Sequence, residues 1–169
     1  MRLIFGVYNF KAMNQDELFM EEAVQLSRKH MDEGQGGPFG CVVVKDGVVV
    51  GRGWNSVLAG NDPTAHAEVV AIRNACRNLG TYQLTGCTIY TSCEPCPMCM
   101  GAIYWSRPER VFYANTREDA AATGFDDSFI YEELSLPLEQ RKIPMIPMDK
   151  TGALAVFRAW LEKEDRESY

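Results

Sequence analysis

The chain has 169 residues, a formal net charge of −6 and 46% hydrophobic residues. This content is sufficient for one buried core of ordinary size, so the protein is expected to fold without cross-links. The acidic balance disfavours large nucleic acids as partners, because binding a polyanion depends on lysine and arginine neutralising phosphates. A local basic patch can coexist with a negative net charge, so the balance weakens the expectation of an RNA substrate without removing it.

The number and spacing of the cysteines bear on whether the protein binds a metal or is cross-linked by disulfides. Three of the six cysteines fall within seven residues, in the stretch CEPCPMC that runs from Cys93 to Cys99. Crowded cysteines in a small secreted chain usually form disulfides. The N-terminal stretch MRLIFGVYNFK, however, is too short an apolar run to span a membrane and has no clear cleavage site. We therefore expect a cytoplasmic protein whose thiols are reduced and whose cysteine cluster binds a metal.

The first half of the chain predicts a helix, a hairpin and a second helix. The helix covers 14–31, where an asparagine followed three positions later by glutamate forms a capping box ahead of an apolar stripe. Strands are predicted at 39–44 and 48–54, joined by a tight Asp-Gly turn. A polar loop over 55–63 leads to helical apolar spacing over 65–79, which stops at a glycine.

The second half begins with a strand at 87–91, a short helix at 97–105 and a strand at 111–114. Two strands separated by a helix form a parallel crossover, whereas the hairpin is antiparallel. The sheet is therefore expected to be mixed, with about five strands, inside a three-layer α/β/α sandwich.

Beyond residue 116 the periodicity is weaker. Helices are predicted at 117–122, 126–134 and 154–160, and a proline-containing edge strand at 143–148. No repeat or linker is visible, so 1–169 is expected to be a single domain. Residues 1–13 are a possible N-terminal extension, because Met13 would serve equally well as a start.

The spacing of Cys96 and Cys99 is typical of two metal ligands. Residues three apart lie on one face of a helix, and Pro97 between them suits the first position of that helix. Both sulfurs would then lie at a helix N-terminus, where the macrodipole lowers their pKa and makes them better ligands.

A nitrogen ligand must come from one of two histidines. His66 stands where the second helix begins, whereas His30 lies inside the first helix and is expected to be a surface or boundary residue. One histidine and two cysteines give zinc three protein ligands and a fourth position open to water, which implies catalysis. Cys93 is a possible fourth ligand that would close the site, but it precedes the helix by several residues, so we favour a structural thiol.

Glu68 completes the pattern. At the first turn of a helix, side chains tilt toward the N-terminal end, so His66 and Glu68 can both reach one centre. A carboxylate beside an activated water can take its proton and pass it to a leaving group. The pattern H-x-E followed after about thirty residues by P-C-x-x-C is the signature of zinc deaminases, in which the glutamate shuttles protons and does not bind the metal.

Further stretches resemble a known family from about residue 14 onward: GGPFG, NDPTAHAE, SCEPCPMC, GAIYW, GFDDSFIY and the terminal Tyr169. They resemble the cytidine deaminase-like superfamily of zinc deaminases and, within it, the bacterial guanine deaminases. The resemblance implies hydrolysis of guanine to xanthine and ammonia with one zinc ion per subunit. It also implies a homodimer whose C-terminal segments, about 135–169, are exchanged between subunits.

The same resemblance implies substrate contacts, namely from Asn55, Asp127, Phe39, Trp105, Ala67 and Tyr169. A carboxylate such as Asp127 can accept hydrogen bonds from guanine N1–H and the exocyclic amine, although Asp126 is an equally acidic neighbour. From the pattern alone, Phe39 and Trp105 are as typical of core positions, and Asn55 of a turn. Tyr169 would close over its own site or that of the partner.

Two other functions share parts of this pattern. A deaminase acting on adenosine in tRNA or on cytosine has the same metal site, and an RNA enzyme should show a basic groove and salt-sensitive binding. A zinc-stabilised binding module without chemistry would need neither an open metal position nor Glu68.

Overall fold

The computed structural model describes residues 13–168 and divides the chain into two compact units, Met1–Thr116 and Arg117–Tyr169. The possible N-terminal extension therefore lies almost entirely outside the described residues. The expectation of a single domain stays a prediction.

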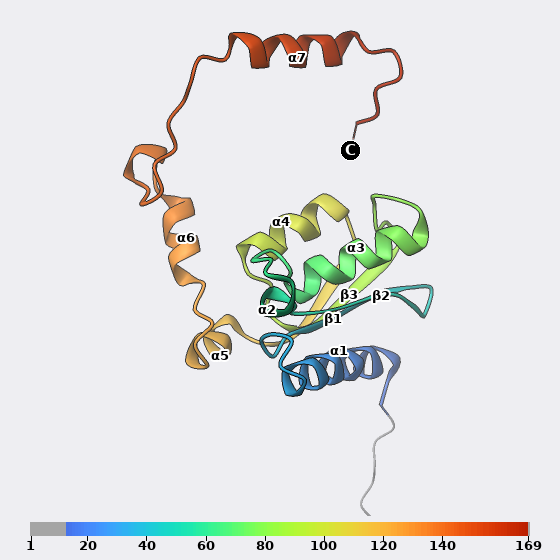
Figure 1. Ribbon diagram of the computed structural model, residues 1–169. Coiled ribbons are helices and arrows are strands. Elements are labelled where there is room, and N and C mark those ends of the chain that lie inside the picture. The colour runs from blue at the N-terminus through green and yellow to red at the C-terminus, as the bar shows by residue number, and fades with distance from the viewer. Residues whose placement is uncertain (1–12, 169) are drawn as a thin grey trace, which may run out of the picture. The chain divides into compact units, whose positions relative to one another are not determined.

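A mixed sheet with strand order β2-β1-β3-β4 forms the centre of the first unit (Figure 1). Its strands are β1 (Gly40–Lys45), β2 (Val48–Trp54), β3 (Cys87–Cys93) and β4 (Arg110–Asn115). Strand β1 pairs antiparallel with both β2 and β3, whereas β3 and β4 are parallel. The predicted hairpin and the predicted parallel crossover are both confirmed, with four strands in the described chain in place of about five.

The hairpin turn adopts the backbone that its sequence predicts. Asp46 has φ 51° and Gly47 has φ 76°, so both central residues are left-handed. Two left-handed residues match the twist of the flanking strands, and glycine and aspartate are among the residues that tolerate this conformation.

Helices cover both faces of the sheet, as the sandwich prediction requires (Figure 1). They are α1 (Gln15–Asp32), α2 (Val57–Gly60), α3 (Ala67–Leu79) and α4 (Pro97–Ser106). The capping box of α1 is confirmed, because the Asn14 side chain accepts from the Glu17 backbone N–H at 2.9 Å and the Glu17 carboxylate accepts from the Asn14 N–H at 2.7 Å. The prediction of an unbroken loop at 55–63 is wrong, since α2 lies within it.

Alternate residues of β1 belong to two hydrophobic clusters, one on each face of the sheet. Val42 and Val44 pack with α1 in one cluster, whereas Cys41 and Val43 pack with α3 in the other. Neighbouring strand residues point to opposite faces, so a strand covered on both sides is apolar throughout.

Helix α3 lies unusually close to strand β2. A Cβ atom added to Gly53 would lie 2.1 Å from the backbone oxygen of Ala67, and one added to Gly51 would lie 2.5 Å from that of Ala71. Ala67, Ala71 and Ala75 recur every four residues and are fully buried, which gives α3 a flat stripe toward the strand. The glycines therefore determine how closely the first turn of α3 approaches the sheet.

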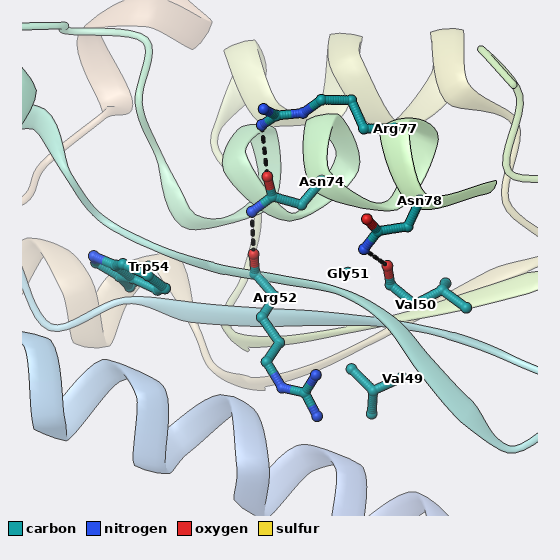
Figure 2. Close-up of a pocket in the computed structure, with 8 residues that line it drawn as sticks. All are labelled: Val49, Val50, Gly51, Arg52, Trp54, Asn74, Arg77 and Asn78. Carbon is teal, nitrogen blue, oxygen red and sulfur yellow. Dashed lines mark hydrogen bonds between the residues drawn. The ribbon is translucent and has the colours of Figure 1, made fainter. Parts of the chain in front are cut away.

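Two asparagines of α3 cover the outer edge of β2 (Figure 2). Asn74 Nδ2 donates to the Arg52 carbonyl and Asn78 Nδ2 to the Val50 carbonyl, both at 2.8 Å. Arg77 donates to Asn74 Oδ1 at 2.6 Å and holds that amide in place. Carbonyls occupied in this way are no longer available for pairing with another strand, which is a common means of preventing aggregation at an edge.

The second unit is helical. It contains α5 (Arg117–Ala122), α6 (Ser128–Ser135), the 3₁₀ helix η1 (Leu138–Gln140) and α7 (Thr151–Glu162). The predicted edge strand at 143–148 is wrong, because this segment has no regular structure. Pro144 and Pro147 each lack the N–H that a strand ladder needs. Within residues 13–168, no helix is both long and apolar enough to cross a membrane.

We predict that Gly53→Ala lowers the free energy of unfolding by about 3 kcal/mol or more, because the added methyl group meets backbone atoms that cannot rotate away. Urea denaturation of the purified protein measures this loss. Gly101→Ala is the control, since a Cβ added to that exposed helical glycine has nothing within 4 Å. It should stabilise the protein by roughly 0.5–1 kcal/mol. Equal stability of the Gly53→Ala variant and the parent would contradict the close approach.

Candidate active site

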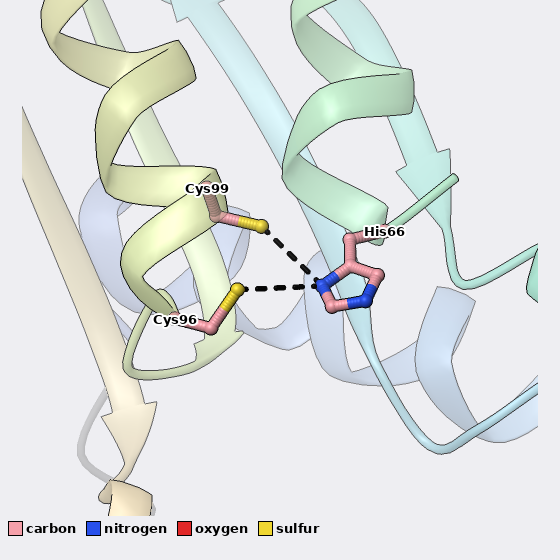
Figure 3. Close-up of side chains that lie close together, drawn as sticks. All are labelled: His66, Cys96 and Cys99. Carbon is pink, nitrogen blue, oxygen red and sulfur yellow. Dashed lines mark hydrogen bonds between the residues drawn. The ribbon is translucent and has the colours of Figure 1, made fainter. Parts of the chain in front are cut away.

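Two helix N-termini bring the predicted ligands together. His66 is the residue that immediately precedes α3, and Cys96 is the residue that immediately precedes α4. Pro97 occupies the start of α4 as expected, and Cys99 follows within the first turn. Figure 3 shows the side chains of His66, Cys96 and Cys99 pointing toward one another from the two helices.

The distances within this cluster suit a zinc ion. Cys96 Sγ and Cys99 Sγ each lie 3.5 Å from His66 Nδ1, and the three ligating atoms all fall within 4.8 Å of one another. A tetrahedral ion with Zn–S of about 2.3 Å and Zn–N of about 2.0 Å separates sulfur from nitrogen by about 3.5 Å. The side chains are therefore arranged as they would be around zinc.

Hydrogen bonds within the cluster shift the pKa values of all three side chains. The pKa of Cys96 is lowered to about 4, chiefly by a hydrogen bond from Cys99 and also by one from His66. The pKa of Cys99 is raised by its hydrogen bond with Cys96 and by burial. The hydrogen bond to Cys96 also raises the pKa of His66. Metal ligation requires thiolates and a neutral imidazole, so a bound cation would displace the protons that these side chains hold.

Cys93 is not a member of this cluster. It ends strand β3, is buried, and has its Sγ 3.5 Å from the Thr116 carbonyl oxygen. This position agrees with the structural thiol that we favoured over a fourth ligand.

Glu68 lies beside the cluster and is almost fully buried, with 6% of its surface exposed. Its Oε1 accepts from Thr91 Oγ1 at 3.0 Å, and its Oε2 accepts from Cys99 Sγ at 3.3 Å. Burial raises the pKa of the carboxyl, against the opposing effect of these hydrogen bonds. A buried carboxyl of this kind is suited to holding and releasing a proton.

Asn55 follows β2 and is held by the glycine-rich segment before β1. Its Oδ1 accepts from the backbone N–H groups of Gly37 and Val57, each at 3.3 Å, and its own N–H donates to the Phe39 carbonyl at 3.0 Å. A Cβ added to Gly36 would lie 2.2 Å from the Asn55 carbonyl oxygen, so that glycine permits the contact. Because Oδ1 is engaged, the Asn55 amide is oriented with Nδ2 as its remaining polar group.

The other predicted contact residues lie in different surroundings. Phe39 is partly buried against the core, and Ala67 is fully buried at the start of α3. Trp105, near the end of α4, is 66% exposed. In the second unit, Asp126 accepts from the Ser128 N–H at 2.9 Å, and Asp127 is the residue that precedes α6. Tyr169 lies outside the described residues.

The expectation that His30 is a surface or boundary residue is wrong. It is 7% exposed and stacks on Trp54, with ring centroids 3.7 Å apart and an interplanar angle of 11°. Its Nδ1 lies 3.1 Å from Glu33 Oε2, and it takes no part in the His66 cluster. The stack buries the ring because α1 packs over the end of β2, a contact that helical periodicity alone does not reveal.

The cluster lies within a segment that matches a known protein family. Residues 13–115 match the cytidine and deoxycytidylate deaminase zinc-binding region, a match that covers more than half of the chain. The chain belongs to this family of zinc-dependent deaminases, and zinc is the metal for which its cluster is built.

Among the relatives, guanine deaminase from Bacillus subtilis (strain 168) is 54% identical over 153 residues, which are 90% of this chain and 98% of that protein. The crystal structure of B. subtilis guanine deaminase superimposes with a TM-score of 0.89 and covers 93% of this chain and 99% of that one. The tRNA-specific adenosine deaminase of the same organism is 38% identical over 121 residues, which are 72% of this chain and 74% of that protein.

Thr91 contacts Glu68 but was not among the predicted site residues. The sequence gives only a weak indication of this role. Alternate residues of β3 point toward α3, namely Cys87, Ile89 and Thr91, and Thr91 is the one with a polar side chain. Threonine is common in strands, so its presence in β3 does not by itself indicate a function. The role of the Thr91 hydroxyl can be inferred only once the position of Glu68 is known.

We predict that Cys96→Ala reduces bound zinc to well under one ion per chain, because two ligands remain where the cluster provides three. Elemental analysis of the purified protein measures the zinc content. Cys93→Ala is the matched control, since it removes a nearby buried thiol from outside the cluster and should leave one zinc per chain. Loss of zinc from a folded Cys93→Ala variant would show that the site is built differently.

Proposed function

We propose that this protein catalyses the zinc-dependent hydrolysis of guanine to xanthine and ammonia. The single observation that carries the proposal is a buried carboxylate, Glu68, beside a cluster of one imidazole and two thiols. The high identity to a guanine deaminase along nearly the whole chain supports guanine as the substrate.

The residues perform the reaction as follows. His66, Cys96 and Cys99 would hold zinc, which when bound supplies an activated water near neutral pH. Glu68 takes the proton of that water at Oε2, the oxygen directed toward the cluster. The water oxygen bonds to C2 of the purine while Glu68 delivers the proton to the amino nitrogen there. The C2–N bond then breaks, ammonia leaves, and the purine keeps the oxygen and its remaining proton as xanthine. Burial raises the pKa of the carboxyl, which helps Glu68 to hold the proton between the two transfers.

The purine is held by groups of complementary hydrogen-bonding character. Asn55 presents its Nδ2 as a donor, which suits an acceptor of guanine such as the ring nitrogens or O6. Asp127 is proposed as the acceptor for N1–H, and Asp126 is its equally acidic neighbour. Phe39, Ala67 and Trp105 are proposed to line the pocket, and Tyr169 to close over it. Apolar walls with few oriented polar groups are usual for sites of this size.

The two alternatives are less well supported. The tRNA-specific relative is less similar and covers less of the chain, and the net charge of −6 does not favour a polyanion. A purely structural zinc module needs no carboxyl group beside the metal ligands. Burying such a group costs free energy. Glu68 is only 6% exposed, so its position favours a catalytic role.

We also propose a cytoplasmic homodimer with exchanged C-terminal segments, about 135–169. Reduced surroundings suit a site that needs two free thiols. Exposed apolar side chains on α7, such as Phe157 at 71%, and on α4, such as Tyr104 at 75%, are suited to burial in a partner. Light scattering that finds one chain per particle would contradict the dimer.

We predict that the zinc-loaded protein releases ammonia from guanine in a panel of free nucleobases and nucleosides. Glu68→Gln should retain zinc but lose at least about 1,000-fold in kcat, because an amide cannot shuttle the proton. Ammonia release and zinc content are measured on the same samples. Ammonia from adenosine or cytosine alone would refute guanine as the substrate, and full activity of the glutamine variant would refute the role of Glu68.

We predict that Asn55→Asp lowers kcat/KM for guanine by about 100-fold or more, since it replaces the donor by a charged acceptor that meets an acceptor of the base. The remaining oxygen can still accept from the two backbone N–H groups, so the fold should be preserved. Steady-state kinetics with circular dichroism tests both parts. Asn61→Asp, on the exposed end of α2, is the matched control and should be near neutral.

A further inference from the structure

Thr91 is a buried hydroxyl at the site for which the reaction as described has no use. It is 1% exposed, and its Oγ1 donates to Glu68 Oε1 at 3.0 Å. The carboxylate that accepts this bond is itself 6% exposed. A hydrogen bond to a charged group in such surroundings is stronger than one in water.

The sheet holds the Thr91 backbone on both sides. Thr91 pairs with Cys41 of β1 in the antiparallel ladder and with Tyr113 of β4 in the parallel ladder. A β-branched side chain also has few accessible rotamers. The hydroxyl is therefore a fixed point, in contrast to Glu68, whose longer side chain has three rotatable bonds.

The two oxygens of Glu68 have different partners. Oε1 is bonded to Thr91, on the strand, whereas Oε2 lies 3.3 Å from Cys99 Sγ, within the group that would hold zinc. Fixing one oxygen on the sheet determines where the other one points. Only Oε2 is then directed to the place where protons must be exchanged.

We propose that Thr91 is a positioning residue for the deamination reaction, whose hydroxyl anchors Glu68 Oε1 so that Oε2 faces the reacting atoms. The inference deepens the proposed function and rests on it. Misplacing a catalytic group by about 1 Å can cost about 100-fold in rate, so a single anchoring bond can have a large effect on turnover.

Two substitutions separate this role from ordinary packing. Thr91→Val keeps the shape and removes the hydroxyl, whereas Thr91→Ser keeps the hydroxyl and removes a buried methyl group. If Thr91 only packs, the serine variant, which leaves a small cavity, should lose at least as much activity as the valine variant. If Thr91 positions Glu68, the order of activity is reversed.

The experiment measures kcat, KM, zinc content and melting temperature of the zinc-loaded variants with guanine. We expect Thr91→Val to lose about 100-fold in kcat with KM and zinc unchanged, and Thr91→Ser to stay within about fivefold of the parent. In a Glu68→Gln background, Thr91→Val should add no further loss. Crystal structures should show Glu68 in its original place in the serine variant and displaced in the valine variant.

Parental kcat for Thr91→Val, a serine variant as impaired as the valine variant, or an unmoved Glu68 in the valine variant would each overturn the inference. Failure of the parent protein to release ammonia from guanine would overturn the proposed function instead. The crystal structures would still decide whether Thr91 fixes Glu68.

Discussion

The near contact between the backbones of α3 and β2 is the constraint on which the site depends. Glycines on the strand and alanines on the helix leave only alanine methyl groups between them, and a Cβ at Gly53 would lie 2.1 Å from the Ala67 oxygen. This contact lies at the first turn of α3, next to His66 and Glu68. The helix N-terminus is thereby fixed against the sheet. The rigid backbone at this point determines the positions of both functional side chains.

The parallel crossover supplies the other half of the site. Strand β3 ends at Cys93, and the chain turns into α4, so Cys96 and Cys99 emerge at the same end of the sheet as His66. Ligands separated by thirty residues along the chain therefore meet within 4.8 Å. Open α/β sheets commonly place their ligands at the carboxyl ends of strands for this topological reason.

The thiols of Cys96 and Cys99 and the carboxyl of Glu68 are ionisable groups that lie close together. The pKa of the Cys96 thiol is lowered and that of the Cys99 thiol is raised, and a buried carboxyl with a raised pKa stands next to them. Like charges this close cannot all ionise without a cation, so the cluster holds protons that zinc displaces. Glu68 is different, because the hydrogen bond from Thr91 keeps one of its oxygens oriented while the other can exchange a proton.

The sequence by itself determined the local elements and the chemistry. The capping box at Asn14, the Asp46-Gly47 turn and the spacing of His66, Glu68, Cys96 and Cys99 depend on neighbours in the chain, and they follow from residue type and period. Patterns of this kind could not predict the burial of His30 on Trp54, the engagement of Asn55 Oδ1 or the bond from Thr91 to Glu68, because each joins segments whose distance in space is set by packing. The predicted strand at 143–148 failed for a related reason: strand periodicity means little where prolines remove the donors of the ladder. What only the tertiary structure decided is therefore which polar atoms face one another, since hydrogen bonds depend on distances and directions that no linear pattern contains.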